Sequence, residues 1–159
     1  MTETQALPPT TRTPATPATP EQFVSVQHFL NRQMQLLDDG RAADWAATFT
    51  EDGVFAQDTR PEGRRGRAVL AERMEHHVGV IAARGLTRRH WIGMLSVEQD
   101  EDGAEQGRVR ARYYAIVVDT PADGEAGLHL STVCDDVLVP AGESWLVAHR
   151  YIHHDNHRP

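Results

Sequence analysis

Large apolar residues recur at every third or fourth position between residues 21 and 39, which predicts an amphipathic helix with one buried side. Thr19 can cap the start of this helix, and Pro20 suits its first position, where a helix leaves the amide without a partner. The pattern stops at Gly40, a residue type that commonly follows the last helical turn. The apolar positions are Phe23, Val26, Phe29, Leu30, Met34 and Leu37.

Two further helices are predicted in the first half of the chain. A short one is expected around Trp45 and Phe49, and the polar run at residues 51–53 breaks its pattern. A longer one is predicted from residue 67 to about residue 84, where apolar side chains again gather on one side, and Gly85 ends it. All the predicted helices therefore precede the long strands described next.

Apolar and polar residues alternate in the second half of the chain, which predicts β-strands. Before them, residues 54–56 are expected to form a short strand, and residues 64–66 a basic turn. Helices first and strands afterwards indicate an α+β fold, in which a curved antiparallel sheet wraps over three helices and leaves a pocket between them. The four long strands are expected at residues 87–98, 108–119, 128–139 and 144–154.

The length and composition fit one compact domain preceded by a tail. The chain has 159 residues, of which 40% are hydrophobic and 25% are charged. Residues 1–20 are rich in Thr, Pro and Ala and are expected to form a flexible tail, so the domain is predicted to cover residues 21–156. No apolar run is long enough to span a bilayer and none resembles a secretory signal, so a cytoplasmic location is expected.

Charge and residue usage exclude several classes of function. The 16 basic residues, all of them Arg, face 23 acidic residues, and the formal net charge of -7 argues against binding to nucleic acid or to an anionic membrane. The lack of Lys excludes Schiff-base chemistry. The single Cys134 excludes an intrachain disulfide and a cysteine-rich metal site.

A set of segments in a fixed order carries a family resemblance. The segments are residues 26–40, Trp45, residues 49–55, Gly66, Arg89-His90 and residues 142–150. Together they resemble the nuclear transport factor 2-like superfamily, in particular its SnoaL-like dehydratases and cyclases, and they are also similar to ring-hydroxylating dioxygenase β subunits. The resemblance runs from about Glu21 to Asn156. It implies a cone-shaped, cystatin-like fold with an internal pocket, and a homodimer or homotrimer.

The resemblance also implies a cofactor-independent dehydratase, isomerase or cyclase of bacterial secondary metabolism, acting on a hydrophobic, carbonyl-bearing small molecule. Asp38 and His90 are the expected acid–base pair, because relatives place an Asp of the first helix against a His that opens a central strand. Such a pair can move protons near neutral pH. Alternatively, Asp38 caps a turn together with Asp39, and His90 is a core residue bound to backbone.

Two departures from the relatives bear on substrate binding. Gln33 stands where many relatives have a Tyr, and it can exchange hydrogen bonds with a substrate but cannot act as a phenolic acid. Met94 stands where relatives often have an Asn, which is expected to make the pocket more apolar. Both residues are predicted to line the site, and both favour a hydrophobic polycyclic or polyketide-like ligand.

Three further residues are candidates for the pocket wall. Trp45 and Tyr113 are expected to contact the substrate, although aromatic residues at such positions also serve as plain core. Arg150 matches a position where relatives carry an Arg at the pocket mouth, so it is expected to hold a substrate oxygen. Its alternative role is a salt bridge to Asp135 or Asp136 on the neighbouring strand.

Two other classes of function remain open. The chain is either a non-catalytic partner, similar to a dioxygenase β subunit that supports a separate iron-bearing chain, or a module that binds a metabolite without converting it. The nine His residues invite a metal site, but His149 and His153 lie four residues apart, roughly 13 Å along an extended strand, which is too far to share one ion. No metal and no cofactor are expected.

Overall fold

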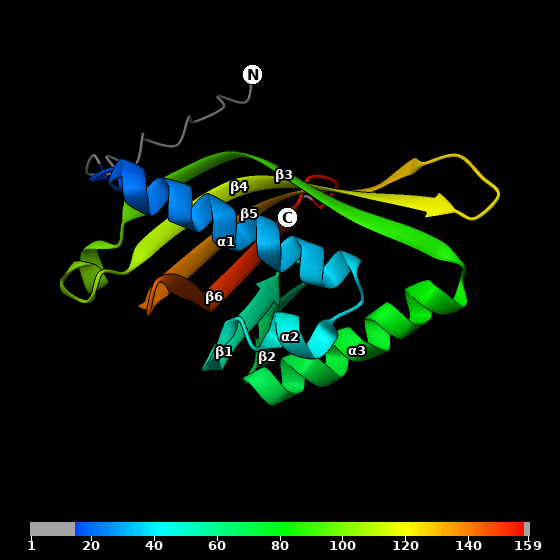
Figure 1. Cartoon of the computed structure of the whole chain (residues 1–159), viewed down its shortest axis with the longest axis horizontal. Helices are drawn as coiled ribbons and strands as arrows, with labels where there is room; N and C mark the ends of the chain where they lie inside the picture. The colour runs from blue at the N-terminus through cyan, green and yellow to red at the C-terminus, as the bar shows by residue number, and fades with distance from the viewer. Residues whose placement is uncertain (1–14, 158–159) are drawn as a thin grey trace, which may run out of the picture.

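Helices from the first half of the chain lie across a curved sheet formed largely by the second half (Figure 1). This arrangement comes from a computed structural model, which describes residues 15–157. Within that range, none of the helices is both long and apolar enough to cross a bilayer. The helices are α1 (Pro20–Asp38), α2 (Ala42–Ala46), α3 (Arg67–Ala83) and the 3-10 helix η1 (Glu101–Gln106), of which η1 was not predicted.

Six strands form one sheet in the order β2-β1-β6-β5-β4-β3. Neighbouring strands are antiparallel, except that β1 and β6 run parallel. The predicted α+β class and the four long antiparallel strands are confirmed. The strands are β1 (Phe49–Gln57), β2 (Arg60–Arg65), β3 (Leu86–Gln99), β4 (Val109–Pro121), β5 (Gly127–Ala141) and β6 (Ser144–His154).

Two predictions about the segment before α3 are wrong. Residues 49–53 do not end a helix but begin β1, and residues 64–66 do not form a turn because β2 continues to residue 65. The reason is Gly53, which suggests a break in the sequence pattern but lies within β1. A side chain there would lie 3.0 Å from the Phe49 side chain and 3.2 Å from the Val147 carbonyl oxygen, so this glycine allows a close crossing of strands and does not break the strand.

The start of the domain is ordered by hydrogen bonds. Thr19 and Gln22 form a capping box, in which each side chain accepts from the backbone amide of the other residue. Before the cap, the amide of Ala18 donates to Val97 on β3 at 3.0 Å. The prediction of a flexible tail is therefore wrong for residues 15–20, while residues 1–14 lie outside the described residues.

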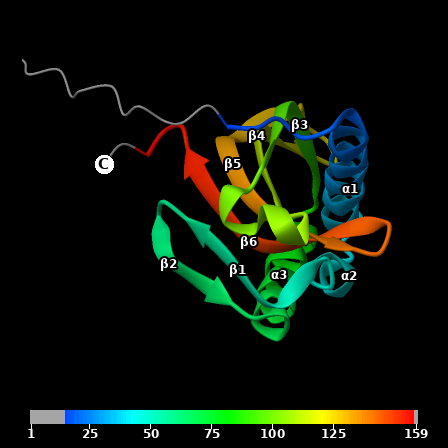
Figure 2. The ribbon, with the colours of Figure 1, turned by 90° about the vertical axis from the view of Figure 1, so that its left-hand side faces the viewer.

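The core fills the space between α1 and the concave face of the sheet. The buried side of α1 carries the predicted apolar positions Val26 and Leu30. Trp145 on β6 ties the two layers together, because its ring nitrogen donates to the Ser25 hydroxyl of α1 at 2.9 Å. Figure 2 shows the sheet curving from β6 to β3, with α1 and α3 on its concave side.

An irregularity in β6 decides which of its residues face inward. Val137 pairs with His149 and Leu138 pairs with Val147, so Ala148 is an extra residue without an opposite partner. The strict alternation predicted for residues 144–154 is interrupted there. As a result Val147 and Arg150 are both buried on the inner face, although they lie three positions apart.

Candidate active site

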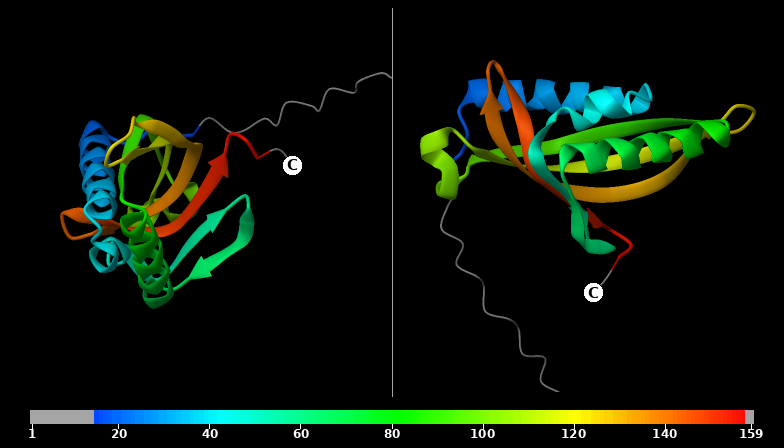
Figure 3. Two further views of the ribbon diagram at one scale, coloured as in Figure 1. Left: turned by 90° about the vertical axis from the view of Figure 1, so that its right-hand side faces the viewer. Right: turned by 90° about the horizontal axis from the view of Figure 1, so that it is seen from below.

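A cavity of about 620 Å³ lies between the end of α1, the second half of α3 and the concave face of the sheet. Its size is typical of a small-molecule site. In the view from below in Figure 3, α3 lies in front of the strands of the sheet. The apolar lining includes Met34, Leu37, Met74, Val78, Ile81, Val117, Leu130 and Ile152.

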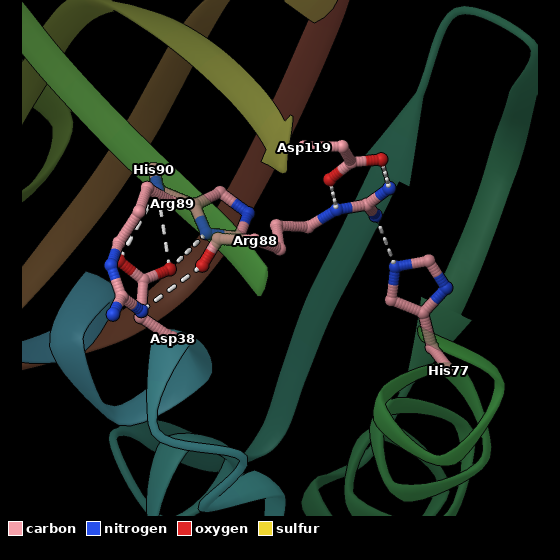
Figure 4. A network of polar contacts seen from close by, with 6 residues as sticks. All are labelled: Asp38, His77, Arg88, Arg89, His90 and Asp119. Atoms are coloured by element: carbon pink, nitrogen blue, oxygen red, sulfur yellow. Dashed lines mark hydrogen bonds and ion pairs between the residues drawn. The ribbon is translucent and has the colours of Figure 1, made fainter. Parts of the chain in front are cut away.

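Asp38 and His90 meet in the cavity wall (Figure 4). His90 Nδ1 lies 2.7 Å from Asp38 Oδ1, and the His90 backbone amide donates to the same carboxylate at 3.2 and 3.3 Å. A carboxylate accepts hydrogen bonds, so in the neutral imidazole the proton is on Nδ1 and Nε2 has a lone pair. The pair is largely buried, with side chains 11% and 19% exposed for Asp38 and His90. The expected juxtaposition of these residues is thus present.

Local structure explains how the chain brings the two residues together. Asp38 is the last residue of α1, one turn beyond the buried Met34, and Asp39 takes the cap position instead. His90 lies opposite Val117 on β4, which is buried on the inner face, whereas the next residue Trp91 is 70% exposed. Strand alternation therefore directs His90 inward, a choice that the sequence pattern alone left open.

A second polar network lines the cavity beside this pair (Figure 4). Arg88 makes two hydrogen bonds to Asp119, both at 2.7 Å, and its Nη1 lies 3.0 Å from His77 Nε2. Arg has no acceptor, so His77 Nε2 must accept, and the His77 proton sits on Nδ1. Partial burial and then the Arg88 guanidinium lower the pKa of His77. His77 is therefore a neutral hydrogen-bond donor near neutral pH.

The Asp38–His90 pair provides a base in the cavity wall. His90 presents an imidazole nitrogen that can remove a proton, and the adjacent carboxylate stabilises the imidazolium that forms. His77 lies on the other side of Arg88, and its Nδ1 is turned away from His90 (Figure 4). The Asp38–His90 pair therefore suits proton abstraction next to a carbonyl group.

The lowered pKa of His77 predicts a pH-dependent effect on stability. Arg88, His90 and His129 oppose protonation of this imidazole, and Asp119 favours it. The unfolded chain takes up a proton near pH 6.5 that the folded protein resists, so this group lowers the stability of the folded state as the pH falls through that value. The variant His77→Gln is expected to lose less stability than wild type between about pH 8 and pH 5, as measured by urea unfolding.

A matched control comes from the adjacent helix residue. His76→Gln reports what the same substitution does to α3 itself at the two pH values, since His76 is exposed and does not line the cavity. If wild type and His77→Gln lose equal free energy of unfolding on acidification, the prediction is wrong.

Arg150 is held by protein groups. It is 2% exposed, its Nε and Nη2 donate to Asp136 at 2.8 and 2.7 Å, and Nη2 also donates to Gln33 at 2.6 Å. Burial by itself would lower the pKa of Arg150, but the Asp136 carboxylate outweighs it and raises that pKa. Of the two alternatives, the salt bridge to Asp136 is present, whereas Asp135 binds Arg112 at 2.7 Å. Arg150 still borders the cavity.

Three predicted pocket residues belong to the core and do not line the cavity. Gln33 is fully buried and is occupied by Arg150 and by Thr48, to which its amide donates at 2.6 Å. Trp45 is 1% exposed and packs on Phe49, with ring centres 4.8 Å apart. Tyr113 is fully buried, and its hydroxyl donates to Asp136 at 3.2 Å. Their predicted substrate contacts are corrected because these side chains are used up in packing and internal hydrogen bonds.

The predicted position of Met94 in the pocket is also wrong. Met94 has a φ of 52°, and the pairing of β3 with β4 shifts register between Gly93 and Ser96. This bulge turns the side chain to the outer face, where it is 78% exposed. A bulge depends on the partner strand, so alternation along β3 did not reveal it.

The sequence analysis missed several lining residues, and part of the signal was present. Arg88 shares the inward face of β3 with His90, and His154 shares that of β6 with Arg150. Strand alternation puts each of them on the same face as a predicted site residue, so the pattern could have indicated both. Their hydrogen-bond partners come from distant segments of the chain, which leave no signal in the local sequence. Among residues 15–157, no three His, Cys, Asp or Glu side chains are grouped in a way that could hold a metal ion.

Comparison with known proteins identifies relatives over most of the chain. A family model described as SnoaL-like domain matches residues 21–151. ActVI-ORFA from Streptomyces coelicolor is 31% identical, with 87% of this chain and 98% of that chain covered and a TM-score of 0.78. A Catenulispora acidiphila protein, solved in complex with S-DNPA, is 32% identical, with 87% and 96% covered and a TM-score of 0.73. No curated protein gives a significant match.

A more distant likeness bears on the fold alone. A Novosphingobium aromaticivorans structure, described as the β subunit of an aromatic-ring-hydroxylating dioxygenase, is 20% identical, with 86% of this chain and 91% of that chain covered and a TM-score of 0.69. The architecture is therefore the nuclear transport factor 2-like, cystatin-like fold, as predicted. One fold of this kind supports many unrelated functions, so this likeness does not assign one.

Proposed function

The chain belongs to the SnoaL-like domain family, and from that premise we propose that it is a cofactor-independent dehydratase, isomerase or cyclase acting on a hydrophobic, carbonyl-bearing small molecule. The observation that carries the proposal is the hydrogen bond between Asp38 and His90 in the wall of the cavity. A carboxylate-oriented imidazole in a largely apolar cavity is suited to general acid–base catalysis.

The proposed mechanism starts with proton removal. His90 Nε2 takes a proton from the carbon next to the substrate carbonyl, and the electron pair moves onto the carbonyl oxygen to form an enolate. If a β-hydroxyl group is present, the enolate expels it, the imidazolium of His90 returns its proton to the leaving oxygen, and water departs. If none is present, the proton returns to another carbon. Alternatively, the enolate carbon attacks a second carbonyl and closes a ring, and the alkoxide that forms takes the proton back from the His90 imidazolium.

Two features support the hydrophobic class of substrate. The lining of the cavity is mostly aliphatic along α1 and α3, while polar groups lie at the end of α1, on β3 and on the strands β5 and β6. In addition, a relative that is 32% identical has been solved with the small molecule S-DNPA. A polycyclic or polyketide-like carbonyl compound of bacterial secondary metabolism is the proposed substrate.

The test is a thermal-shift screen of the purified protein against polycyclic, polyketide and terpenoid carbonyl compounds, followed by mass spectrometry of each stabilising compound. A ligand that binds the folded state raises the unfolding midpoint. Loss of one water, or an isomer of unchanged mass, supports the proposal. Stabilisation by many compounds without conversion of any would contradict it and favour a module that only binds its ligand.

We further propose that the protein self-associates through the outer face of β3 and β4. Trp91 and Ile116 lie opposite each other on this face and are 70% and 42% exposed, and the exposed Tyr114 lies beside them. Monomers rarely leave such apolar neighbours uncovered. Trp91→Glu is expected to convert the oligomer to monomer in light scattering, whereas Val24→Glu, at an exposed apolar position on α1, should not. A wild-type protein that is monomeric would refute the proposal.

A further inference from the structure

A second histidine–carboxylate pair borders the same cavity. His154 is the last residue of β6, and Asp58 lies in the turn between β1 and β2. His154 Nδ1 lies 2.6 Å from Asp58 Oδ1, and the His154 backbone amide donates to Asp58 Oδ2 at 2.6 Å. Their side chains are 12% and 15% exposed, and His154 lines the cavity. Neither residue takes part in the mechanism described above.

The geometry repeats that of Asp38 and His90. In both pairs one carboxylate accepts from the backbone amide and from Nδ1 of the same histidine. Burial would raise the pKa of Asp58, but its hydrogen bonds with His154 outweigh this effect and lower that pKa, so Asp58 is an anion near neutral pH. The proton of neutral His154 therefore sits on Nδ1, and Nε2 is left with its lone pair.

The register of the sheet places the two pairs at opposite sides of the cavity. His154 lies opposite Thr132, which lies opposite Ala115 on β4, and these two residues line the cavity floor. His90 is on β3, beyond β4. The two histidines are thus three strand spacings apart, about 14 Å across the strands, and are offset by two residues along them, about 7 Å, because His154 is in register with Ile92. The curvature of the sheet brings their side chains closer. An extended multi-ring ligand can contact both.

We propose that Asp58 and His154 form a second acid–base pair, which exchanges a proton at the far end of the ligand held by Asp38 and His90. This inference rests on the proposed function and narrows the substrate to conjugated polycyclic carbonyl compounds. His90 removes a proton next to the carbonyl, the electron pair is delocalised through the conjugated enolate, and protonated His154 delivers a proton to the distant atom. The ligand keeps its mass, His90 gains one proton and His154 loses one, and both imidazoles re-equilibrate with water.

The test uses 5-nitrobenzisoxazole, a bicyclic probe that reports any accessible base. The base removes the C3 proton, the N–O bond breaks, and 2-cyano-4-nitrophenolate appears as a coloured product. The probe rate is measured in His90→Gln and after a second substitution, His154→Gln or Asp58→Asn, is added. The second substitution is expected to lower the remaining protein-dependent rate about 10-fold or more. It should also remove the increase of that rate with pH, which in His90→Gln follows the deprotonation of a single group. Asp58→Asn keeps an oxygen that can accept from the His154 amide, so it separates catalysis from support of the strand end.

The control is His153→Gln in the same background. His153 is the neighbouring residue of β6, but it is half exposed on the outer face, where it contacts Asp135, and its replacement should leave the rate unchanged. The inference is overturned if His154→Gln and Asp58→Asn leave both the rate and its pH dependence as in His90→Gln alone. Failure of the proposed function has a different signature, which is wild-type turnover of a substrate from the compound screen in the single variant His90→Gln.

Discussion

Asp38→Asn and His90→Gln are each expected to lower turnover of a substrate found in the compound screen by about 10²- to 10⁴-fold, the usual contribution of general acid–base catalysis. Gln at position 90 has no basic nitrogen. Asn at position 38 removes the charge that stabilises the imidazolium, and its NH₂ group can donate to Nδ1, which moves the imidazole proton to Nε2 and blocks the base. Initial rates measured by mass spectrometry give the size of the effect.

The control removes a carboxylate away from the cavity. Asp44 on α2 is half exposed and pairs with Arg41, so Asp44→Asn should retain wild-type turnover. All three variants should give the circular dichroism spectrum of the wild-type protein, because none of the substitutions changes side-chain volume greatly. Wild-type turnover in both Asp38→Asn and His90→Gln would rule out the proposed acid–base pair.

Asp136→Ala is expected to lower the free energy of unfolding by about 3–5 kcal/mol, because it leaves the guanidinium of Arg150 buried without its counter-charge. Arg150 cannot remove this unpaired charge by losing its proton, since an Arg side chain stays protonated in proteins. The buried hydroxyl of Tyr113 loses its acceptor in the same variant. Urea unfolding monitored by circular dichroism measures the change.

The neighbouring residue provides the matched control. Asp135 pairs with Arg112 on the outer face, where both side chains are about half exposed, so Asp135→Ala should cost only about 0–1 kcal/mol. Replacing both buried partners, as Asp136→Leu with Arg150→Met, is expected to recover much of the stability lost in Asp136→Ala, because no unpaired charge remains. Equal losses for Asp135→Ala and Asp136→Ala would contradict this account of the buried pair.

Prediction from sequence succeeded for elements whose buried side produces a regular pattern of apolar residues in the local sequence. The apolar spacing of α1 and the alternation in β4 follow directly from which side of each element is covered, so both elements were predicted close to their observed bounds. β1 and β2 were harder, because a polar edge strand such as residues 60–65 lacks an apolar face and is defined by pairing with its neighbour.

The site was predicted only as far as single-strand patterns and family likeness reach. The contact between Asp38 and His90 was predicted in this way. The tautomer of His77 depends on Arg88 of another element, and the face of Met94 depends on a bulge against β4, so neither could be derived from the local sequence. For Gln33 the predicted position on the inner side of α1 is correct, but the predicted contact with substrate is not. Its side chain is hydrogen-bonded to Arg150, which lies 117 positions later in the chain and could not be identified as its partner from the local sequence.

The place of β6 in the sheet has a consequence for folding kinetics. β6 is the last strand of the described residues along the chain, yet it sits between β5 and β1 in the interior of the sheet. During synthesis the β1–β2 hairpin therefore stays unconnected to the rest of the sheet until some ninety later residues have been added. Closing so long a loop is entropically costly, and contacts between distant segments slow folding. We expect the cavity to be assembled in a late step, in which β6 joins the two parts of the sheet and carries Arg150 and His154 into place together.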